Sequence, residues 1–108
     1  MLNAQPASVG LSTIAGSVIY LSGAISRDPD WRSKFAGWES EAAKHSPKRI
    51  LSPTIFPEGW EYDEYMEHCM IMVRRSDIIV MLPCWKNSTG AEAELAYARS
   101  LNRLVVLL

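Results

Sequence analysis

The chain has 108 residues, of which 48% are hydrophobic and 21% are charged, and its formal net charge is -1 at pH 7. This length suits a single domain, and the composition is that of a globular protein that needs no disulfide or structural metal to fold. A near-neutral charge disfavours binding to polymeric nucleic acid or to an anionic membrane, so any nucleotide ligand is expected to be a small molecule.

Cysteine usage and the first residues favour a cytoplasmic protein. Cys69 and Cys84 are the only cysteines, and their spacing fits neither a disulfide framework nor a zinc site. Residues 1–17 lack the pattern of a signal peptide, and no apolar run approaches the ~20 residues of a membrane helix. Residues 1–16 are small and weakly patterned, so we expect a loose N-terminal extension before a domain at residues 17–108.

The first half of the domain is expected to contain a strand, a helix and a second strand. Residues 18–21 form an apolar, β-branched and aromatic run before a Ser-Gly-Ala turn, the pattern of a buried parallel strand. Asp28 and Pro29 are suited to the N-cap and the first position of a helix that we expect to end near Lys44. Residues 49–52 predict a short second strand, followed by a proline-rich loop.

The second half continues the alternation. Residues 62–75 carry aromatic and apolar side chains at helical spacing, which predicts an amphipathic helix on a sheet. Residues 77–82 predict a third buried strand, residues 88–101 a helix, and residues 104–108 a fourth strand. This order predicts a flavodoxin-like or Rossmann-like three-layer α/β sandwich with a parallel sheet of four or five strands. In such sheets, ligands bind beyond the carboxyl ends of the strands, where the strand order reverses.

Glu94 does not fit the pattern of its helix. At about 100° per residue, the buried stripe includes Ala91 and Leu95, and Glu94 falls inside the same arc. Burying an unpaired carboxylate costs free energy or raises its pKa, so an acid in this arc commonly lines a cleft. The alternative is a structural role, in which Glu94 forms a salt bridge with an arginine such as Arg27 or a hydrogen bond with Tyr20.

The start of the same helix has the features of an anion site. The backbone amides near Gly90 can bind a phosphate group, and Ser88 can donate its hydroxyl group. Ser-Thr-Gly before a helix is also a common N-cap that needs no ligand. Trp60 and Trp85 are expected in loops on the ligand side, where each could stack on a nucleobase or cover an edge of the core.

Three segments together resemble the nucleoside 2-deoxyribosyltransferase superfamily. They are residues 20–25 after the first strand, residues 76–77 before the third strand, and residues 83–98 with the sequence PCWKNSTGAEAELAYA. In the last block, a serine is followed two residues later by a glycine and four residues beyond it by a glutamate on a helix. The chain looks closest to the short branch found in phage and prophage genomes, and the resemblance covers most of the chain from Val18 onward.

The resemblance implies a specific chemistry for this site, without a metal or an organic cofactor. Glu94 would attack the anomeric carbon of a 2-deoxynucleoside and release the base, and water or a second base would resolve the covalent intermediate. Tyr20 would position the carboxylate. A serine at the position of Ser88 is similar to the enzymes that hydrolyse 2-deoxynucleoside 5′-monophosphates, where it contacts phosphate. The substrate-binding residues implied by the resemblance are Ser22, Gly23, Ala24, Trp85, Ser88 and Gly90.

Cys69 is the main departure from that family. The active enzymes carry an aspartate on the middle helix that helps to protonate the leaving base, and Cys69 falls at that position. A thiol is a weak donor with an ordinary pKa near ~8.5, so the general acid would be missing unless Asp63 or Glu64 reaches the site. Its loss commonly costs ~10² to 10⁴ in rate. A non-catalytic nucleotide-binding module is therefore the alternative to an N-glycosidase or deoxyribosyltransferase.

Other residues are expected to play smaller parts. We expect His45 and His68 at the surface, and Asp77 in a structural role at the start of a strand. The aromatic helix faces around Trp31 and Tyr65 are compatible with the homo-oligomer that we expect, and also with ordinary core packing. A third possibility is a small domain that binds another protein and has a vestigial cleft.

Overall fold

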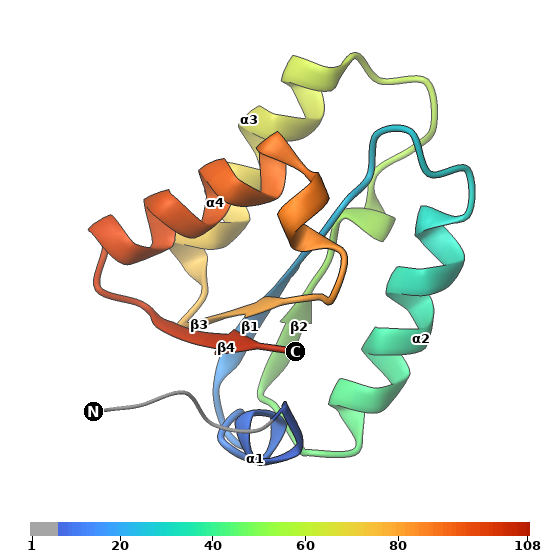
Figure 1. Cartoon of the computed structure of the whole chain (residues 1–108). Coiled ribbons are helices and arrows are strands. Elements are labelled where there is room, and N and C mark those ends of the chain that lie inside the picture. The colour runs from blue at the N-terminus through green and yellow to red at the C-terminus, as the bar shows by residue number, and fades with distance from the viewer. Residues whose placement is uncertain (1–6) are drawn as a thin grey trace.

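A computed structural model describes residues 7–108, and these residues form one parallel sheet with helices on both faces. The strands are β1 (Val18–Ser22), β2 (Arg49–Leu51), β3 (Ile78–Met81) and β4 (Leu104–Leu107), in the order β2-β1-β3-β4. Helices α3 (Tyr62–Arg75) and α4 (Thr89–Ser100) pack on one face, and α1 (Ala7–Ser12) and α2 (Trp31–Ala43) pack on the other, as Figure 1 shows. The structure confirms the predicted α/β sandwich.

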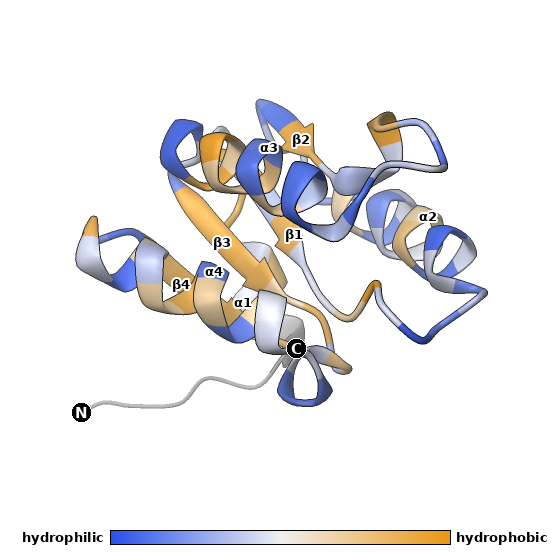
Figure 2. Cartoon of the chain, turned by 90° about the horizontal axis from the view of Figure 1, so that it is seen from above, coloured by the Kyte–Doolittle hydropathy of each residue, from blue (hydrophilic) through white to orange (hydrophobic). Residues whose placement is uncertain are grey.

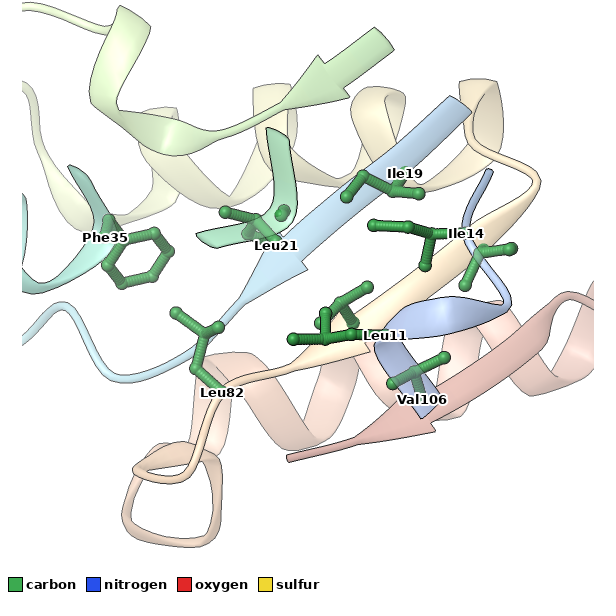
Figure 3. Close-up of a cluster of buried hydrophobic side chains, with 10 residues drawn as sticks. Leu11, Ile14, Ile19, Leu21, Phe35, Leu82 and Val106 are labelled. Carbon is green, nitrogen blue, oxygen red and sulfur yellow. The ribbon is translucent and has the colours of Figure 1, made fainter. Parts of the chain in front are cut away.

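The alternation of side chains along β1 divides the core into two layers. Ile19 and Leu21 join a hydrophobic cluster with Phe35 of α2, shown in Figure 3, whereas Tyr20 joins Cys69 of α3 on the opposite face. Both faces of the sheet are covered, which explains why the strands are almost continuously hydrophobic and form the apolar centre of the molecule in Figure 2.

The helix boundaries agree closely with the sequence pattern at α3 and α4, and less well at α2. Helix α2 begins at Trp31 instead of Pro29. The Asp28 carboxylate accepts a hydrogen bond from the backbone amide of Asp30 at 3.0 Å, so Asp28 stabilises the turn before the helix and is not its N-cap. Ser88 is the N-cap of α4, where its hydroxyl oxygen accepts a hydrogen bond from the amide of Ala91 at 3.1 Å.

The segment before β1 differs from the loose extension that the sequence suggested. Residues 1–6 lie outside the described residues, but α1 follows directly, and Leu11 and Ile14 are buried in the cluster of Figure 3. Gly10 allows the close approach, because a Cβ atom there would lie 2.9 Å from Cγ1 of Val106 on β4. Gly10 therefore serves close packing between α1 and β4.

The order of the strands determines where a ligand site can form. From β1 the chain passes to β2 through α2 on one face, and it then returns past β1 to β3 through α3 on the other face. The strand order reverses between β1 and β3, so their carboxyl ends border a crevice. The amide of Leu82 donates to the carbonyl of Ser22 at 2.8 Å, which keeps the two strand ends together at this point.

Replacing Ile14 by alanine should test whether this segment belongs to the folded domain. Ile14 is fully buried, so Ile14→Ala should lower the free energy of unfolding by about 2–5 kcal/mol through lost burial and a residual cavity. Ile55→Ala is the control, because Ile55 is 70% exposed and its loss should change stability by less than about 0.5 kcal/mol. Urea denaturation measures both, and equal effects would contradict the packing of this segment.

Candidate active site

Glu94 is the charged group at the centre of the candidate site. It lies on the inner face of α4 and is only 3% exposed, as its place in the buried arc predicts. The hydroxyl group of Ser22, the last residue of β1, donates a hydrogen bond of 2.7 Å to its Oε1 atom. Among the described residues, the salt bridges join Lys34 to Asp28 and Lys44 to Glu41, so Arg27 does not pair with Glu94.

Burial changes the titration of this carboxyl group. The loss of hydration raises the pKa of Glu94 from 4.5 to about 7, and the hydrogen bond from Ser22 partly opposes this effect. Near neutral pH the group therefore exists in both protonation states. A carboxyl group with this pKa can act as a nucleophile or a base when ionised, and as a proton donor when protonated.

Tyr20 and Cys69 surround Glu94 with neutral polar groups. Burial and the nearby charge of Glu94 raise the pKa of Tyr20 well above its ordinary value of 10.0. The same causes raise the pKa of the Cys69 thiol to about 12. The Tyr20 hydroxyl group is fully buried and makes no aligned hydrogen bond to any described residue. It is therefore an available donor beside the Glu94 carboxyl group.

A cavity of about 180 Å³ opens beside Glu94. The loop after β1 contributes Gly23 and Ser26 to its wall, and α4 contributes Gly90 together with Glu94. The remaining wall comes from α3 and the loop before it, and it is largely aromatic and apolar, with Trp60, Tyr62, Tyr65, Met66 and Cys69. The cavity lies where the strand order reverses, which is the place that the topology favours for a ligand.

A second, more polar cavity of about 360 Å³ adjoins the first one. The two share Ser26, Tyr62, Ser88 and Gly90 in their walls, and the second also includes Arg27. Arg27 has a backbone φ of 67°, a left-handed conformation that is strained for a residue with a side chain. This conformation places an arginine at the opening of the cavity, beside the first residues of α4.

Trp60 is held in the wall of the main cavity by other rings. Its ring stacks on Phe56 with centroids 5.0 Å apart, and it contacts Tyr65 at 5.6 Å and His68 at 4.8 Å. His68 is exposed, as expected, although its ring supports Trp60. The loop before α3 therefore presents a preorganised aromatic surface to any ligand in the cavity.

Gly23 and Gly90, the two glycines among the predicted substrate-binding residues, allow neighbouring elements to pack closely. A Cβ atom at Gly23 would lie 3.1 Å from Sγ of Cys84 and 3.2 Å from Cβ of Leu82. At Gly90, a Cβ atom would lie 2.8 Å from the hydroxyl oxygen of Tyr62 and 3.0 Å from Sδ of Met66, so a side chain here would displace the ends of these two α3 side chains. Both glycines therefore let neighbouring side chains approach closely.

The structure brings together only part of the predicted set. Glu94, Gly23, Ser88 and Gly90 line the main cavity, together with Cys69. Tyr20 and Ser22 are fully buried, and they can act on a ligand only through Glu94. This differs from the expectation that Ser22 binds substrate.

Ala24 lies away from the main cavity, and Trp85 takes the alternative role expected for it, at an edge of the core. Ala24 lines a separate cavity with Lys34 and Trp38 on the α2 side, because the loop after β1 turns its next residue away from Glu94. Trp85 belongs to the short 3-10 helix η2 (Trp85–Asn87) and packs against the hydrophobic cluster beneath α4. The structure therefore places neither side chain in the wall of the main cavity.

Sequence reasoning missed the aromatic wall from α3. Tyr62, Tyr65 and Met66 were interpreted as part of a face packing on the sheet, but the first turns of α3 extend beyond the strand ends and face the cavity. The helical period could not reveal this, because a core face and a cavity face have the same spacing. Asp63 and Glu64 are exposed and accept hydrogen bonds from backbone amides at the helix start, so neither reaches the site.

Two further features of the described residues concern metal clusters and membrane-spanning helices. No group of three or more histidine, cysteine, aspartate or glutamate side chains within residues 7–108 is arranged to hold a metal ion. None of the helices in this part of the chain has the length and hydrophobicity needed to cross a bilayer. Asp77 accepts a hydrogen bond from the amide of Val18 at 2.9 Å and joins β3 to the start of β1, a structural role.

A family model matches most of the chain. A family model described as a domain of unknown function (DUF4406) matches residues 17–107, which includes every strand and the whole candidate site. Comparison with curated proteins gives no match.

Replacing Glu94 by glutamine should change how stability depends on pH. Below pH 4.5 both folded and unfolded chains hold the Glu94 proton, and as pH rises to about 7 only the unfolded chain loses it, so stability falls. Glu94→Gln should remove this loss and make the protein more stable than the wild type above neutral pH, by roughly 3 kcal/mol at most.

Urea denaturation across this pH range provides the measurement. Glu92→Gln is the matched control, because it removes a carboxyl group from an exposed position on the same helix. Parallel pH profiles for the Glu94→Gln variant and the wild type would show that Glu94 titrates normally, and would contradict the raised pKa.

Proposed function

We propose that this chain, which belongs to the DUF4406 family, cleaves or transfers the N-glycosidic bond of a 2-deoxynucleoside or its 5′-monophosphate through Glu94. The observation that carries the proposal is the buried Glu94 carboxyl group, which faces a cavity and has a pKa of about 7. A buried carboxyl group whose pKa is raised by loss of hydration is typical of catalytic sites. The resemblance to nucleoside 2-deoxyribosyltransferases, centred on residues 83–98, supplies the reaction type.

The proposed reaction begins with the ionised form of Glu94. One carboxylate oxygen attacks the anomeric carbon, the bond to the base breaks, and a deoxyribosyl ester of Glu94 forms. Water or a second base then attacks the same carbon and frees the carboxylate. The Ser22 hydrogen bond orients the carboxyl group, and the Tyr20 hydroxyl group is near enough to steady it during the attack.

The two adjoining cavities suit the parts of a nucleotide. The aromatic wall around Trp60 and Tyr65 fits the flat faces of a base, and the sugar would lie between Glu94 and Gly23. The polar cavity offers Arg27 and Ser88 to a 5′-phosphate group. Together the cavities reach the volume of about 300–1,000 Å³ that is typical of small-molecule sites.

A non-catalytic nucleotide-binding module is the second candidate. The observation that favours it is the neutral Cys69 thiol, which lines the cavity and cannot replace a carboxylic acid. Such a module would use the same cavities and bind a nucleotide without releasing its base. Ligand binding would then raise the melting temperature, as binding to any folded state does.

We also propose that the protein acts in the cytoplasm and as a homo-oligomer. Two free cysteines are compatible with a reducing compartment such as the cytoplasm.

The partly exposed aromatic side chains near the cavity support the proposed homo-oligomer. Trp31 and Tyr65 contact each other at 6.5 Å between ring centroids, and both remain partly exposed. A small nucleoside or nucleotide is the expected ligand, and no polymeric nucleic acid is expected.

Removal of the nucleophile should abolish base release. Incubation of the purified protein with a panel of 2-deoxynucleosides and their 5′-monophosphates, with free base measured by chromatography, should show turnover that falls about 10³-fold or more in Glu94→Ala. Glu92→Ala is the matched control and should keep full activity, because Glu92 points to solvent from the same helix. If no panel member is turned over but one raises the melting temperature, the binding module replaces the enzyme.

Arg27 should distinguish nucleotides from nucleosides. A charge-assisted hydrogen bond to phosphate contributes about 1.5–3 kcal/mol, so Arg27→Ala should raise KM for a 5′-monophosphate at least about 10-fold. The KM for the matching nucleoside, which lacks the phosphate group, should change less than about twofold. Steady-state kinetics on the pair gives both values, and equal changes in KM would remove Arg27 from phosphate recognition.

A further inference from the structure

The main cavity has a single carboxyl group. Among the described residues in its wall, the other titratable groups are the phenols of Tyr62 and Tyr65 and the thiol of Cys69. The Tyr65 hydroxyl group already donates to the carbonyl of Pro57 at 2.7 Å, and burial keeps the Cys69 thiol protonated up to a pKa of about 12. Once Glu94 acts as the nucleophile, no carboxylic acid remains in this wall to protonate a departing base.

The main cavity also lacks a positive charge. Its wall contains no lysine, arginine or histidine among the described residues, and the aligned partner of Glu94 is the neutral hydroxyl group of Ser22. The ionised carboxylate is therefore buried without a compensating cation, which is the condition that raises its pKa. A ligand that brings a positive charge into this cavity would be attracted strongly, because the surroundings are poorly polarisable.

The aromatic part of the cavity wall also suits a cationic ring. Trp60, Tyr62 and Tyr65 line the same cavity as Glu94, and the Phe56 ring fixes Trp60 by stacking. Aromatic faces attract flat cations by about 0.5–2 kcal/mol each. The cavity thus combines a buried anion with an aromatic wall, and both features favour the same kind of ligand.

The charge of the leaving group decides whether an acid is needed. A neutral purine or pyrimidine leaves as an anion unless it is protonated, which is the task of the general acid in glycosidic cleavage. A heterocycle that already carries a positive charge takes the electron pair of the broken bond and leaves as a neutral molecule. A site with one carboxylate and no second acid is sufficient for this second class.

We propose that this site releases a cationic heterocycle, bonded through a ring nitrogen to the anomeric carbon of a nucleotide. The inference rests on the proposed function and specifies its substrate. Two sources share this chemistry, namely an N7-alkylated purine nucleotide and a pyridinium nucleotide.

The reaction balances without a proton for the base. A Glu94 carboxylate oxygen forms a bond to the anomeric carbon, and the bond from that carbon to the base nitrogen breaks. The electron pair of the broken bond neutralises the positive ring. Water then adds to the anomeric carbon, the bond to Glu94 breaks, and the proton lost by the water passes to solvent. The products are the neutral base, the sugar phosphate and the regenerated carboxylate.

The test compares two nucleotides that differ in the charge of the base. Wild-type protein is incubated with the 5′-monophosphates of 2′-deoxyguanosine and of 7-methyl-2′-deoxyguanosine, and base release above the Glu94→Ala background is measured. The cationic substrate should have a kcat/KM at least about 10²-fold higher, the lower range for a missing general acid. The 2′-deoxy form of nicotinamide mononucleotide, run in parallel, shows whether the pyridinium source is accepted as well or instead.

Cys69→Asp separates the role of charge from the ease with which each bond breaks. An added acid assists only a base that needs a proton, so Cys69→Asp should raise kcat/KM for the neutral nucleotide relative to that for the cationic ones by about 10²–10⁴. If wild-type protein cleaves neutral and cationic nucleotides with similar kcat/KM, the inference fails and the proposed function stands. If no substrate shows release that depends on Glu94, the proposed function fails, and the inference fails with it. Similar kcat/KM values for the two nucleotides in the wild-type protein would overturn the inference even if Cys69→Asp does not fold.

Discussion

The energetic constraint on the site is the burial of the Glu94 carboxyl group. Three elements converge on it, with Ser22 from β1 donating a hydrogen bond, Cys69 from α3 packing nearby, and α4 carrying the residue itself. A pKa near 7 shows that burial dominates over the hydrogen bond. Burying this carboxyl group lowers the stability of the fold, and the hydrophobic layers on both faces of the sheet must offset that loss. An alanine or leucine at position 94 would not cause it. The fold is thus less stable than it could be at the point where the cavity forms.

The order of the strands explains why the buried Glu94 carboxyl group lies at this position. The reversal of strand order between β1 and β3 leaves a crevice at their carboxyl ends, and α4 crosses this crevice with its first turns. Gly23 and Gly90 keep the walls close, since a Cβ atom at either position would meet a neighbouring side chain at about 3 Å. Among the described residues that line the two cavities, the cation is Arg27 in the polar cavity and the buried acid is Glu94 in the main one. This separation of charge would orient any ligand that spans both cavities and carries charge at one end.

The sequence predicts the fold well and the site in part. Continuous hydrophobic strands and the helical period at residues 62–75 and 88–101 identify the elements nearly to the residue, because both patterns follow directly from burial. Glu94 is found for the same reason, since an acid in a buried arc breaks the period. The sequence leaves two roles open for Trp85 and places Ala24 at the wrong cavity, because the path of a loop depends on contacts that have no sequence period. Asp28 stabilises a turn and does not cap α2, since the same carboxylate can serve either purpose.

Helix α1 has a consequence for any shortened version of the chain. A polypeptide that began at Ser17, where the family match starts, would lack the helix that covers Val106 and would leave Ile19 and Val80 without Ile14 beside them. Strand β4 is at the edge of the sheet and already exposes Leu104 and Leu107. Loss of α1 would uncover Val106 next to this open edge and enlarge the apolar surface there, which favours association between molecules. We therefore expect a chain shortened to Ser17 to be both less stable and more prone to aggregate.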